Sequence, residues 1–211
     1  VDARGPDPSA FAGTTGFQKF LGLELRAKAP PGFAREPMLM DACLPQHDGF
    51  RFMYVLPLSD DRWLFEETFF SDNPELDVEG CAERIHRYAR DQGFDVQSVA
   101  REERGVLPMP WQFGPPNAPD GTLLAGYRGG FFHPVTGYSF PVAVRYASAL
   151  AASPQADDAH SELARFSARH RDQQRFLFLL TRMMFGLFEP ERRFEVLEHF
   201  YRLHEPVIER F

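Results

Sequence analysis

The first part of the chain has the pattern of strands: short apolar or mixed runs that are separated by polar turn residues. We predict four strands, over residues 18–27, 37–43, 50–58 and 62–70. Only a short polar turn, Ser59-Asp60-Asp61, separates the last two runs. Because so short a connection joins neighbouring antiparallel strands, these two should form a hairpin.

The hydrophobic period changes after this hairpin. From Asp77 to Gln92 the apolar residues fall on one helical face, which predicts an amphipathic helix. Asp77 is suited to cap its first turn, and Gly93 stands just past its end. Three further segments follow: a strand over 94–102, a proline-rich loop over 107–120 and a short apolar strand over 122–127.

From Ser139 onward the pattern is helical. We expect a helix over 141–152, a long helix that opens at Asp157 and Asp158, and a final helix after Pro190. Apolar residues cover almost every face of the segment 176–188. A helix of this kind is normally buried, or lines an apolar cavity or a membrane surface.

These elements predict an α+β fold, with a mixed or antiparallel sheet that is followed by helices. No internal repeat and no long linker interrupts the 211 residues. We therefore expect one integrated fragment, in which residues 1–128 form the sheet region and residues 129–211 form a glycine-rich loop and a helical region.

Composition excludes several classes of protein. The net charge of −7 argues against nucleic acid as a main partner. No apolar stretch approaches the ~18–20 residues of a membrane span, and the first residues lack the pattern of a secretory signal. Two cysteines are too few for a disulfide framework, and the histidines show no metal-ligand spacing, so no metal site is expected. The 22 phenylalanines supply more rigid apolar surface than an average core uses.

Two carboxylates stand inside an aromatic run of the predicted strand 62–70. Alternation places Glu67 on the face of Trp63, Phe65 and Phe69, and Glu66 on the opposite face. A carboxylic acid among apolar neighbours has a raised pKa and can donate a proton near neutral pH. The alternative is that one glutamate faces solvent and the other pairs with an arginine, and structural ion pairs outnumber catalytic acids.

A glycine-rich loop, residues 129–139, stands at a strand-to-helix transition. Glycines permit close approach of a flat or phosphorylated ligand, and the N-terminus of the next helix offers free N–H donors. The loop could therefore seat a cofactor. It could equally be an ordinary connection in which the glycines serve turns and His133 is satisfied locally.

Taken together, a series of motifs resembles the bacterial lycopene β-cyclase family. The motifs cover essentially the whole chain, in order and with family-like spacing; they are Gly16-Phe17-Gln18-Lys19-Phe20-Leu21-Gly22, Met40-Asp41-Ala42, Asp48-Gly49-Phe50-Arg51-Phe52, Leu56-Pro57-Leu58-Ser59, Phe65-Glu66-Glu67-Thr68, Arg101-Glu102-Glu103, Gly105-Val106-Leu107-Pro108, Phe132-His133-Pro134-Val135-Thr136-Gly137-Tyr138-Ser139, Glu189-Pro190-Glu191-Arg192-Arg193, Phe200-Tyr201-Arg202-Leu203 and Ile208-Glu209-Arg210-Phe211.

The resemblance implies a Rossmann-type flavoprotein that uses reduced FAD, with NAD(P)H as reductant, to convert the linear ends of lycopene into β-rings without net redox change. It implies that Glu66 is the catalytic acid/base and that Glu67 supports it. It also implies that the flavin is contacted by seven residues of the loop: Gly129, Gly130, His133, Pro134, Thr136, Gly137 and Tyr138. The aromatic excess would then line a dry channel around Glu66, and the apolar segment 176–188 would help to line a tunnel.

The resemblance also implies what lies around this chain. The family's N-terminal dinucleotide-binding segment and the tail after Phe211 are expected outside it, so the fragment alone should be inactive. Uptake of a 40-carbon hydrocarbon implies peripheral contact with a membrane, here the bacterial inner membrane from the cytoplasm. Gly129-Gly130 stands where many flavoproteins have Gly-Asp, and the segment 43–47 is less acidic than expected.

Two other functions stay open at this point. One is another flavoenzyme of the same superfamily, similar to geranylgeranyl reductases or aromatic hydroxylases. The other is a flavin-free module that binds an apolar ligand, because the chain has no pyrophosphate site of its own.

Overall fold

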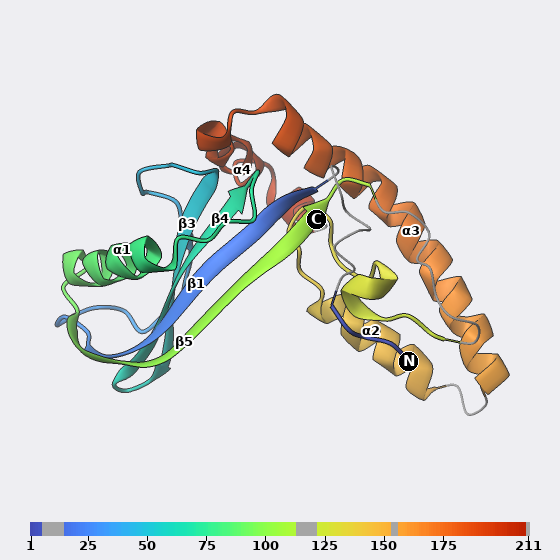
Figure 1. The fold of residues 1–211 in the computed structure, drawn as a ribbon, viewed down its shortest axis with the longest axis horizontal. Coiled ribbons are helices and arrows are strands. Elements are labelled where there is room, and N and C mark those ends of the chain that lie inside the picture. The colour runs from blue at the N-terminus through green and yellow to red at the C-terminus, as the bar shows by residue number, and fades with distance from the viewer. Residues whose placement is uncertain (6–14, 113–121, 153–155, 210–211) are drawn as a thin grey trace. The chain divides into compact units, whose positions relative to one another are not determined.

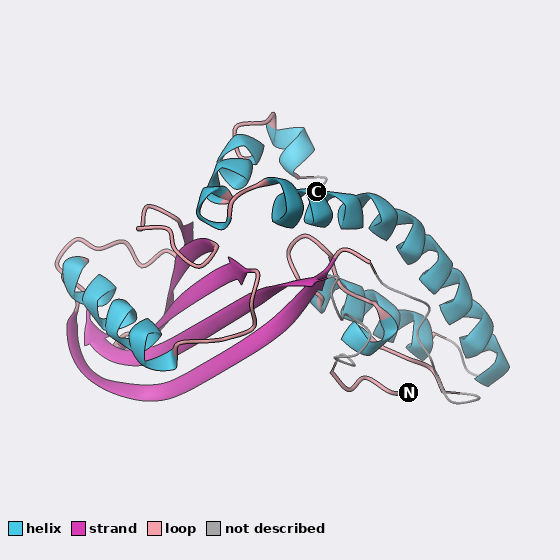
Figure 2. Ribbon diagram, turned by 45° about the horizontal axis from the view of Figure 1, so that its top comes forward, coloured by secondary structure: helices cyan, strands magenta, loops and turns pink. Residues whose placement is uncertain are grey.

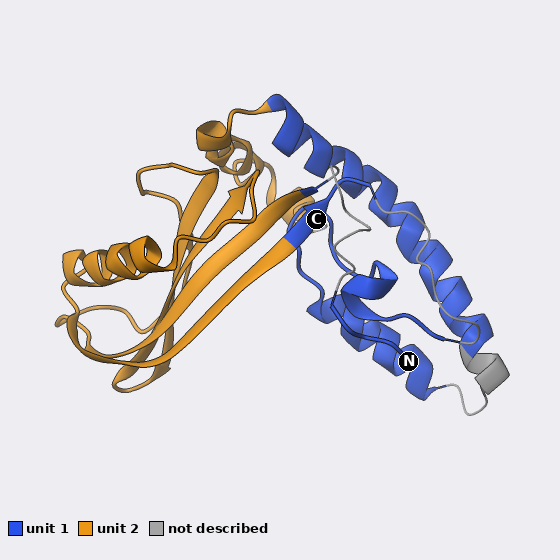
Figure 3. Cartoon of the chain, viewed as in Figure 1, with its two compact units in different colours: residues 1–15, 108–187 blue, residues 16–107, 188–211 orange. Residues whose placement is uncertain are grey.

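A computed structural model describes residues 1–5, 15–112, 122–152 and 156–209, with the backbone alone over 156–159. Contacts group the chain into two compact units, coloured in Figure 3. Unit 1 comprises residues 1–15 and 108–187, and unit 2 comprises 16–107 and 188–211. The expected division at residue 128, which separated regions by role, stays a prediction.

Unit 2 is built on an antiparallel sheet with the strand order β2-β3-β4-β1-β5 (Figures 1 and 2). The fold is therefore α+β, as predicted, and the sheet is antiparallel rather than mixed. The strands are β1 (Thr15–Lys28), β2 (Met38–Asp41), β3 (Phe50–Ser59), β4 (Arg62–Ser71) and β5 (Asp95–Pro110).

The hairpin of β3 and β4 is confirmed, with Tyr54 opposite Glu66 and Met53 opposite Glu67. One expectation was wrong: β5 runs through Pro110, whereas the sequence predicted a loop from residue 107. The prolines at 108 and 110 are tolerated because β5 lies at the edge of the sheet, where a strand can do without some N–H donors.

Helix α1 (Val78–Asp91) covers one face of the sheet, and its prediction is confirmed. The Asp77 carboxylate accepts a hydrogen bond from the Gly80 N–H, and Gly93 adopts the positive φ that ends the helix. Its apolar face joins the inward side chains of β1, β3 and β4 in one core. That core includes Leu21, Leu23, Leu25, Met53, Val55, Trp63, Phe65, Phe69, Cys81, Ile85, Tyr88 and Ala89.

Three short helices follow in unit 2: η3 (Pro190–Arg192), α4 (Phe194–Phe200) and α5 (Glu205–Ile208). The buried Arg193 ties this segment to the sheet. Its guanidinium donates to the Phe70 carbonyl at 3.2 Å and to the Asp72 carboxylate at 2.7 Å. The C-terminal segment is thereby fixed at the end of β4.

Unit 1 contains the 3₁₀ helix η2 (Gly126–Gly129) and the helices α2 (Phe140–Ala151) and α3 (Ala156–Leu187). The predicted helix 141–152 is confirmed. The predicted strand 122–127 is wrong: Leu124 makes an isolated parallel bridge to Asp2, and the chain then turns into η2. The positive φ of Gly126, +55°, is incompatible with a continuing strand.

The last turns of α3 have two different sides. Thr181, Met184 and Phe185 are buried, whereas a stripe of Phe176, Leu179, Met183 and Leu187 is exposed. We call these four residues the apolar stripe. The segment is therefore not buried all round, and its role as a tunnel wall stays a prediction. Within the described residues, α3 and the other helices are too short or too polar to cross a membrane.

Candidate functional site

Glu66 and Glu67 are neighbours in β4 and point to opposite faces of the sheet. Glu67 lies on the face that α1 covers, in register with Leu21 of β1. Glu66 lies on the other face, in register with Gly22 of β1 and Tyr54 of β3. The predicted separation of the two side chains is thus confirmed, and only one of them can act at any single site.

Glu67 is the centre of a buried ion-pair cluster. Its carboxylate has no exposed surface and accepts from Arg51 Nε at 2.5 Å and from Arg84 Nε at 3.0 Å. Arg51 also donates to the Pro45 carbonyl at 2.9 Å. These bonds join β3, β4 and α1. Glu67 therefore holds the core together, which agrees with the structural alternative raised from the sequence.

Glu66 is half-buried and has different partners. Its Oε1 accepts a hydrogen bond from the Thr68 hydroxyl at 3.0 Å. Burial raises the pKa of its carboxyl, and the Thr68 hydrogen bond opposes that shift only in part. Among the ion pairs of the described residues, none involves Glu66. These are the conditions under which a carboxyl keeps its proton to higher pH.

Glycine at position 22 leaves room for this carboxyl. A Cβ atom there would stand 3.1 Å from Glu103 Cγ, 3.3 Å from Leu64 Cδ1 and 3.4 Å from Glu66 Oε2. A larger residue would press first on Glu103 and Leu64, and its further atoms would reach the Glu66 carboxyl. The strand thus provides space on the Glu66 face where the carboxyl lies.

Aromatic rings continue along the same face of β3 and β4. Phe52 lies 5.3 Å from Tyr54 and 5.6 Å from Phe70, measured between ring centroids, in edge-to-face contacts. Burial and, secondarily, the nearby charge of Glu66 raise the pKa of Tyr54 to about 12, so its hydroxyl stays protonated. The carboxyl is therefore bordered by rings whose faces attract positive charge.

The glycine-rich loop of unit 1 is a compact turn. The His133 carbonyl accepts from the Gly137 N–H at 2.8 Å, and the His133 N–H donates to the Tyr138 carbonyl at 2.8 Å. The Tyr127 hydroxyl donates to the Gly137 carbonyl at 2.7 Å, and Thr136 Oγ1 lies 3.1 Å from His133 Nδ1. The side chain of His133 is thus engaged locally, while Thr136 and Tyr138 are exposed.

The two glycines at the start of the loop are required by its geometry. A Cβ at position 129 would lie 2.7 Å from the Phe131 ring and 2.8 Å from the Leu124 carbonyl oxygen. Gly130 has a φ of +77°, in the left-handed region that favours glycine. Helix α2 begins at Phe140, and Ser139 makes no side-chain capping bond to it.

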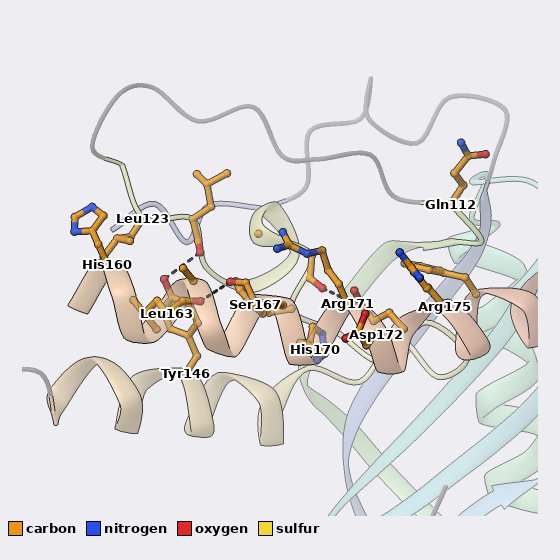
Figure 4. Close-up of a pocket in the computed structure, with 18 of the residues that line it drawn as sticks. Gln112, Leu123, Tyr146, His160, Leu163, Ser167, His170, Arg171, Asp172 and Arg175 are labelled. Carbon is orange, nitrogen blue, oxygen red and sulfur yellow. Dashed lines mark hydrogen bonds between the residues drawn. The ribbon is translucent and has the colours of Figure 1, made fainter. Parts of the chain in front are cut away.

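A pocket of about 940 Å³ lies beside the loop within unit 1 (Figure 4). Its volume is at the upper end of the range for ligand pockets. Gly129, Gly130 and Phe131 form part of its wall, whereas the other five predicted flavin contacts do not line it. Helix α3 contributes polar and basic side chains to the pocket wall, among them His160, Ser167, His170, Arg171, Asp172, Gln174 and Arg175.

The predicted residues thus fall into two groups. Glu66 and Glu67 belong to unit 2, and the loop 129–138 belongs to unit 1. Sequence reasoning did not single out Arg51, Arg84 or Gln174, because each acts through a partner that is distant in the chain. Within the described residues, no three His, Cys, Asp or Glu side chains gather as a metal site would require.

Known proteins resemble this chain over its whole length. It is 42% identical to a lycopene beta-cyclase from a Paracoccus species and 38% identical to one from Pantoea ananas; each match covers 100% of this chain and 56% of the relative. A chloroplastic lycopene beta cyclase of Arabidopsis thaliana is 35% identical over 49% of the chain. The chain therefore spans about half the length of the curated bacterial relatives that it matches.

The fold also has a relative among solved structures. A geranylgeranyl bacteriochlorophyll reductase-like protein from Thermoplasma acidophilum superposes with a TM-score of 0.57 over 92% of this chain and 51% of that one, at 10% identity. This likeness concerns the fold alone. The sequence model of the family described as lycopene cyclase protein matches residues 1–211. The chain belongs to the lycopene cyclase family.

Proposed function

We propose that the protein to which this chain belongs is a lycopene β-cyclase, which closes the linear ends of lycopene into β-rings. The observation that carries the proposal is Glu66: a half-buried carboxyl with a raised pKa, on a sheet face lined with aromatic rings. The names of the bacterial relatives support the substrate and the reaction.

The acid step begins at the Glu66 carboxyl. As a neutral acid it donates its proton to the less substituted carbon of the terminal alkene in one end group, which leaves a tertiary carbocation on the other alkene carbon. The next alkene attacks this cation and forms the carbon–carbon bond that closes the ring. The Glu66 carboxylate then accepts a ring proton, which leaves the new double bond. The product has the formula of the substrate, and Glu66 regains its proton.

The aromatic side chains have two tasks in this scheme. The rings of Phe52, Tyr54 and Phe70 offer negative faces to a nearby cation. They also keep water away, because water would trap the cation as an alcohol. The local Thr68 hydroxyl holds Glu66 Oε1 in place.

We propose FAD as the cofactor, reduced by NAD(P)H, in a Rossmann-type flavoprotein whose dinucleotide-binding segment lies outside this chain. The loop fits such a group: Gly129 and Gly130 line a pocket of suitable size, and Arg171 and Arg175 on α3 offer donors for phosphate. Reduced FAD, when bound, would supply electron density beside a carbocation. The remaining predicted contacts are part of this proposal: His133, Pro134, Thr136, Gly137 and Tyr138.

We also propose peripheral contact with the cytoplasmic face of the bacterial inner membrane, where lycopene dissolves. The apolar stripe of α3 supports this contact, because exposed apolar side chains can enter a bilayer surface. The exposed Arg182 stands beside the stripe and suits anionic lipids. Flotation with anionic vesicles tests it: Leu187→Glu should reduce binding, and Gln173→Glu, on an exposed polar site, should not.

Expression of the full-length gene in a lycopene-producing host tests the reaction. Chromatography and mass spectrometry should find cyclic carotenoids with the mass of lycopene. Glu66→Gln should abolish them, because an amide cannot donate the proton. A product with added hydrogens would instead indicate a reductase, and normal cyclisation by Glu66→Gln would overturn the role given to this residue.

A further inference from the structure

The buried glutamine of helix α3 is bound to the loop that we assign to the flavin. Gln174 is 2% exposed, and its Nε2 donates to the Gly130 carbonyl at 2.6 Å and to the Phe132 carbonyl at 3.0 Å. One amide group therefore uses both of its hydrogens on two carbonyls that lie two residues apart in the same loop. The hydrogen bonds cross 42 and 44 positions of the chain.

These two bonds fix the part of the loop that lines the pocket. Gly129, Gly130 and Gln174 all contribute to the pocket wall. The loop amides are engaged in a turn of their own, since the Gly130 N–H donates to Tyr127 and the Phe131 N–H donates to Gly126. The turn thus holds the N–H groups of Gly130 and Phe131, and Gln174 holds the carbonyls of Gly130 and Phe132.

The neighbouring turn of α3 supports the same contact. His170, one turn before Gln174, packs against the Phe131 ring with 5.6 Å between centroids. Burial lowers the pKa of His170, and the nearby backbone of Gly130 and Phe132 opposes that shift only in part, so the ring places no charge beside the loop carbonyls at pH 7. Gln174 therefore acts next to a neutral imidazole, and its amide supplies two N–H donors to the two carbonyls.

We propose that Gln174 is a positioning residue for flavin binding: it holds the carbonyls of Gly130 and Phe132 so that the glycine pair presents its backbone to the pocket. The inference rests on the proposed role of FAD and adds a residue that acts through the loop. It predicts that the flavin site depends on a side chain that donates two hydrogen bonds at position 174.

The test is FAD affinity of the full-length protein, measured by flavin fluorescence, together with amide hydrogen exchange of residues 130–133 in the flavin-free protein. Gln174→Leu should weaken FAD binding about tenfold or more, because two hydrogen bonds are lost and two carbonyls are left buried. Exchange of the loop amides should become faster. The matched control is Gln173→Leu, since Gln173 is the exposed neighbour on the same helix and should change neither quantity.

Gln174→Glu separates positioning from general packing. A protonated carboxyl can donate to one of the two carbonyls, whereas a carboxylate repels both. FAD binding by this variant should therefore improve as the pH falls, with no such dependence in the Gln173→Glu control. A purely structural role would not create this pH profile. If Gln174→Leu fails to fold, the profile of Gln174→Glu decides the question.

The outcomes distinguish the two proposals. Wild-type affinity in Gln174→Leu, or a flat pH profile in Gln174→Glu, overturns the role of Gln174 and leaves the cyclase proposal standing. FAD binding that depends on Gln174 in a protein that does not cyclise lycopene supports this inference and overturns the proposed reaction. A full-length protein that binds no FAD overturns the inference together with the flavin assignment.

Discussion

Replacing Glu67 with glutamine should destabilise the protein strongly although the shape of the side chain hardly changes. The Glu67 side chain has no exposed surface, and that of its partner Arg51 is 6% exposed; Arg51 Nε lies 2.5 Å from Glu67 Oε1. The amide cannot balance the guanidinium charge, so Arg51 becomes a buried cation without a counter-ion. Removing one member of a buried pair costs about 3–5 kcal/mol. Arg84, at 21% exposure, can turn partly toward water, so we expect the lower end, about 3 kcal/mol.

The loss is large against a typical stability of about 5–15 kcal/mol. Urea titration of the full-length protein measures it, and Trp63, which is buried in the same core, reports unfolding of the sheet through its fluorescence. Glu66→Gln is the matched control, since the same substitution one residue earlier breaks no ion pair. It should not destabilise the protein by more than about 0.5 kcal/mol. A Glu67→Gln protein within about 1 kcal/mol of wild type would refute the ion-pair argument.

Three further changes follow from the same sheet. Burial raises the pKa of Glu66 above 4.5, so the folded protein holds a proton that the unfolded chain releases. The unfolding free energy should therefore fall as the pH rises through the folded pKa. Urea titrations at a series of pH values should show this fall in the wild type and not in Glu66→Gln. Gly22→Val should press on Glu103 and Leu64 and crowd the Glu66 carboxyl, and it should lower the rate of the proposed cyclisation roughly tenfold in product assays. Arg193→Met removes the guanidinium that donates to both the Phe70 carbonyl and the Asp72 carboxylate. It should lower the unfolding free energy by about 1–3 kcal/mol in urea titration. Unchanged stability in Arg193→Met would contradict that role.

Elements set by local pattern could be predicted from the sequence. The β3–β4 hairpin and α1 follow from alternation, from the short turn and from the Asp77 cap, all of which act within a few residues. The continuation of β5 to Pro110 could not be predicted, because a proline is tolerated only once the strand is known to lie at an edge. The failed strand at 122–127 shows the same limit: its local apolar pattern was right for a strand, but pairing depends on a partner elsewhere.

The features of the candidate site also divide into those that local pattern predicts and those that depend on partners distant in the chain. Alternation alone predicted that Glu66 and Glu67 occupy opposite faces, and the register confirms it. The partners of Glu67 could not be predicted, since Arg51 and Arg84 reach it from other elements and many arginines were available. Gln174 carried no sequence signal, because a helix-borne glutamine becomes informative only when the carbonyls it meets are known.

The opposite orientation of two adjacent glutamates has a consequence for how this sequence can change over evolutionary time. Selection on the core acts on Glu67 with its arginines, while selection on the proposed reaction would act on Glu66 and the rings beside it. Under that proposal, substitutions on the Glu66 face would alter substrate preference without weakening the buried cluster. A one-residue insertion in β4 is different, because it would exchange the two faces and remove both properties together. We therefore expect related sequences to vary around Glu66 by substitution and to keep the length of this strand.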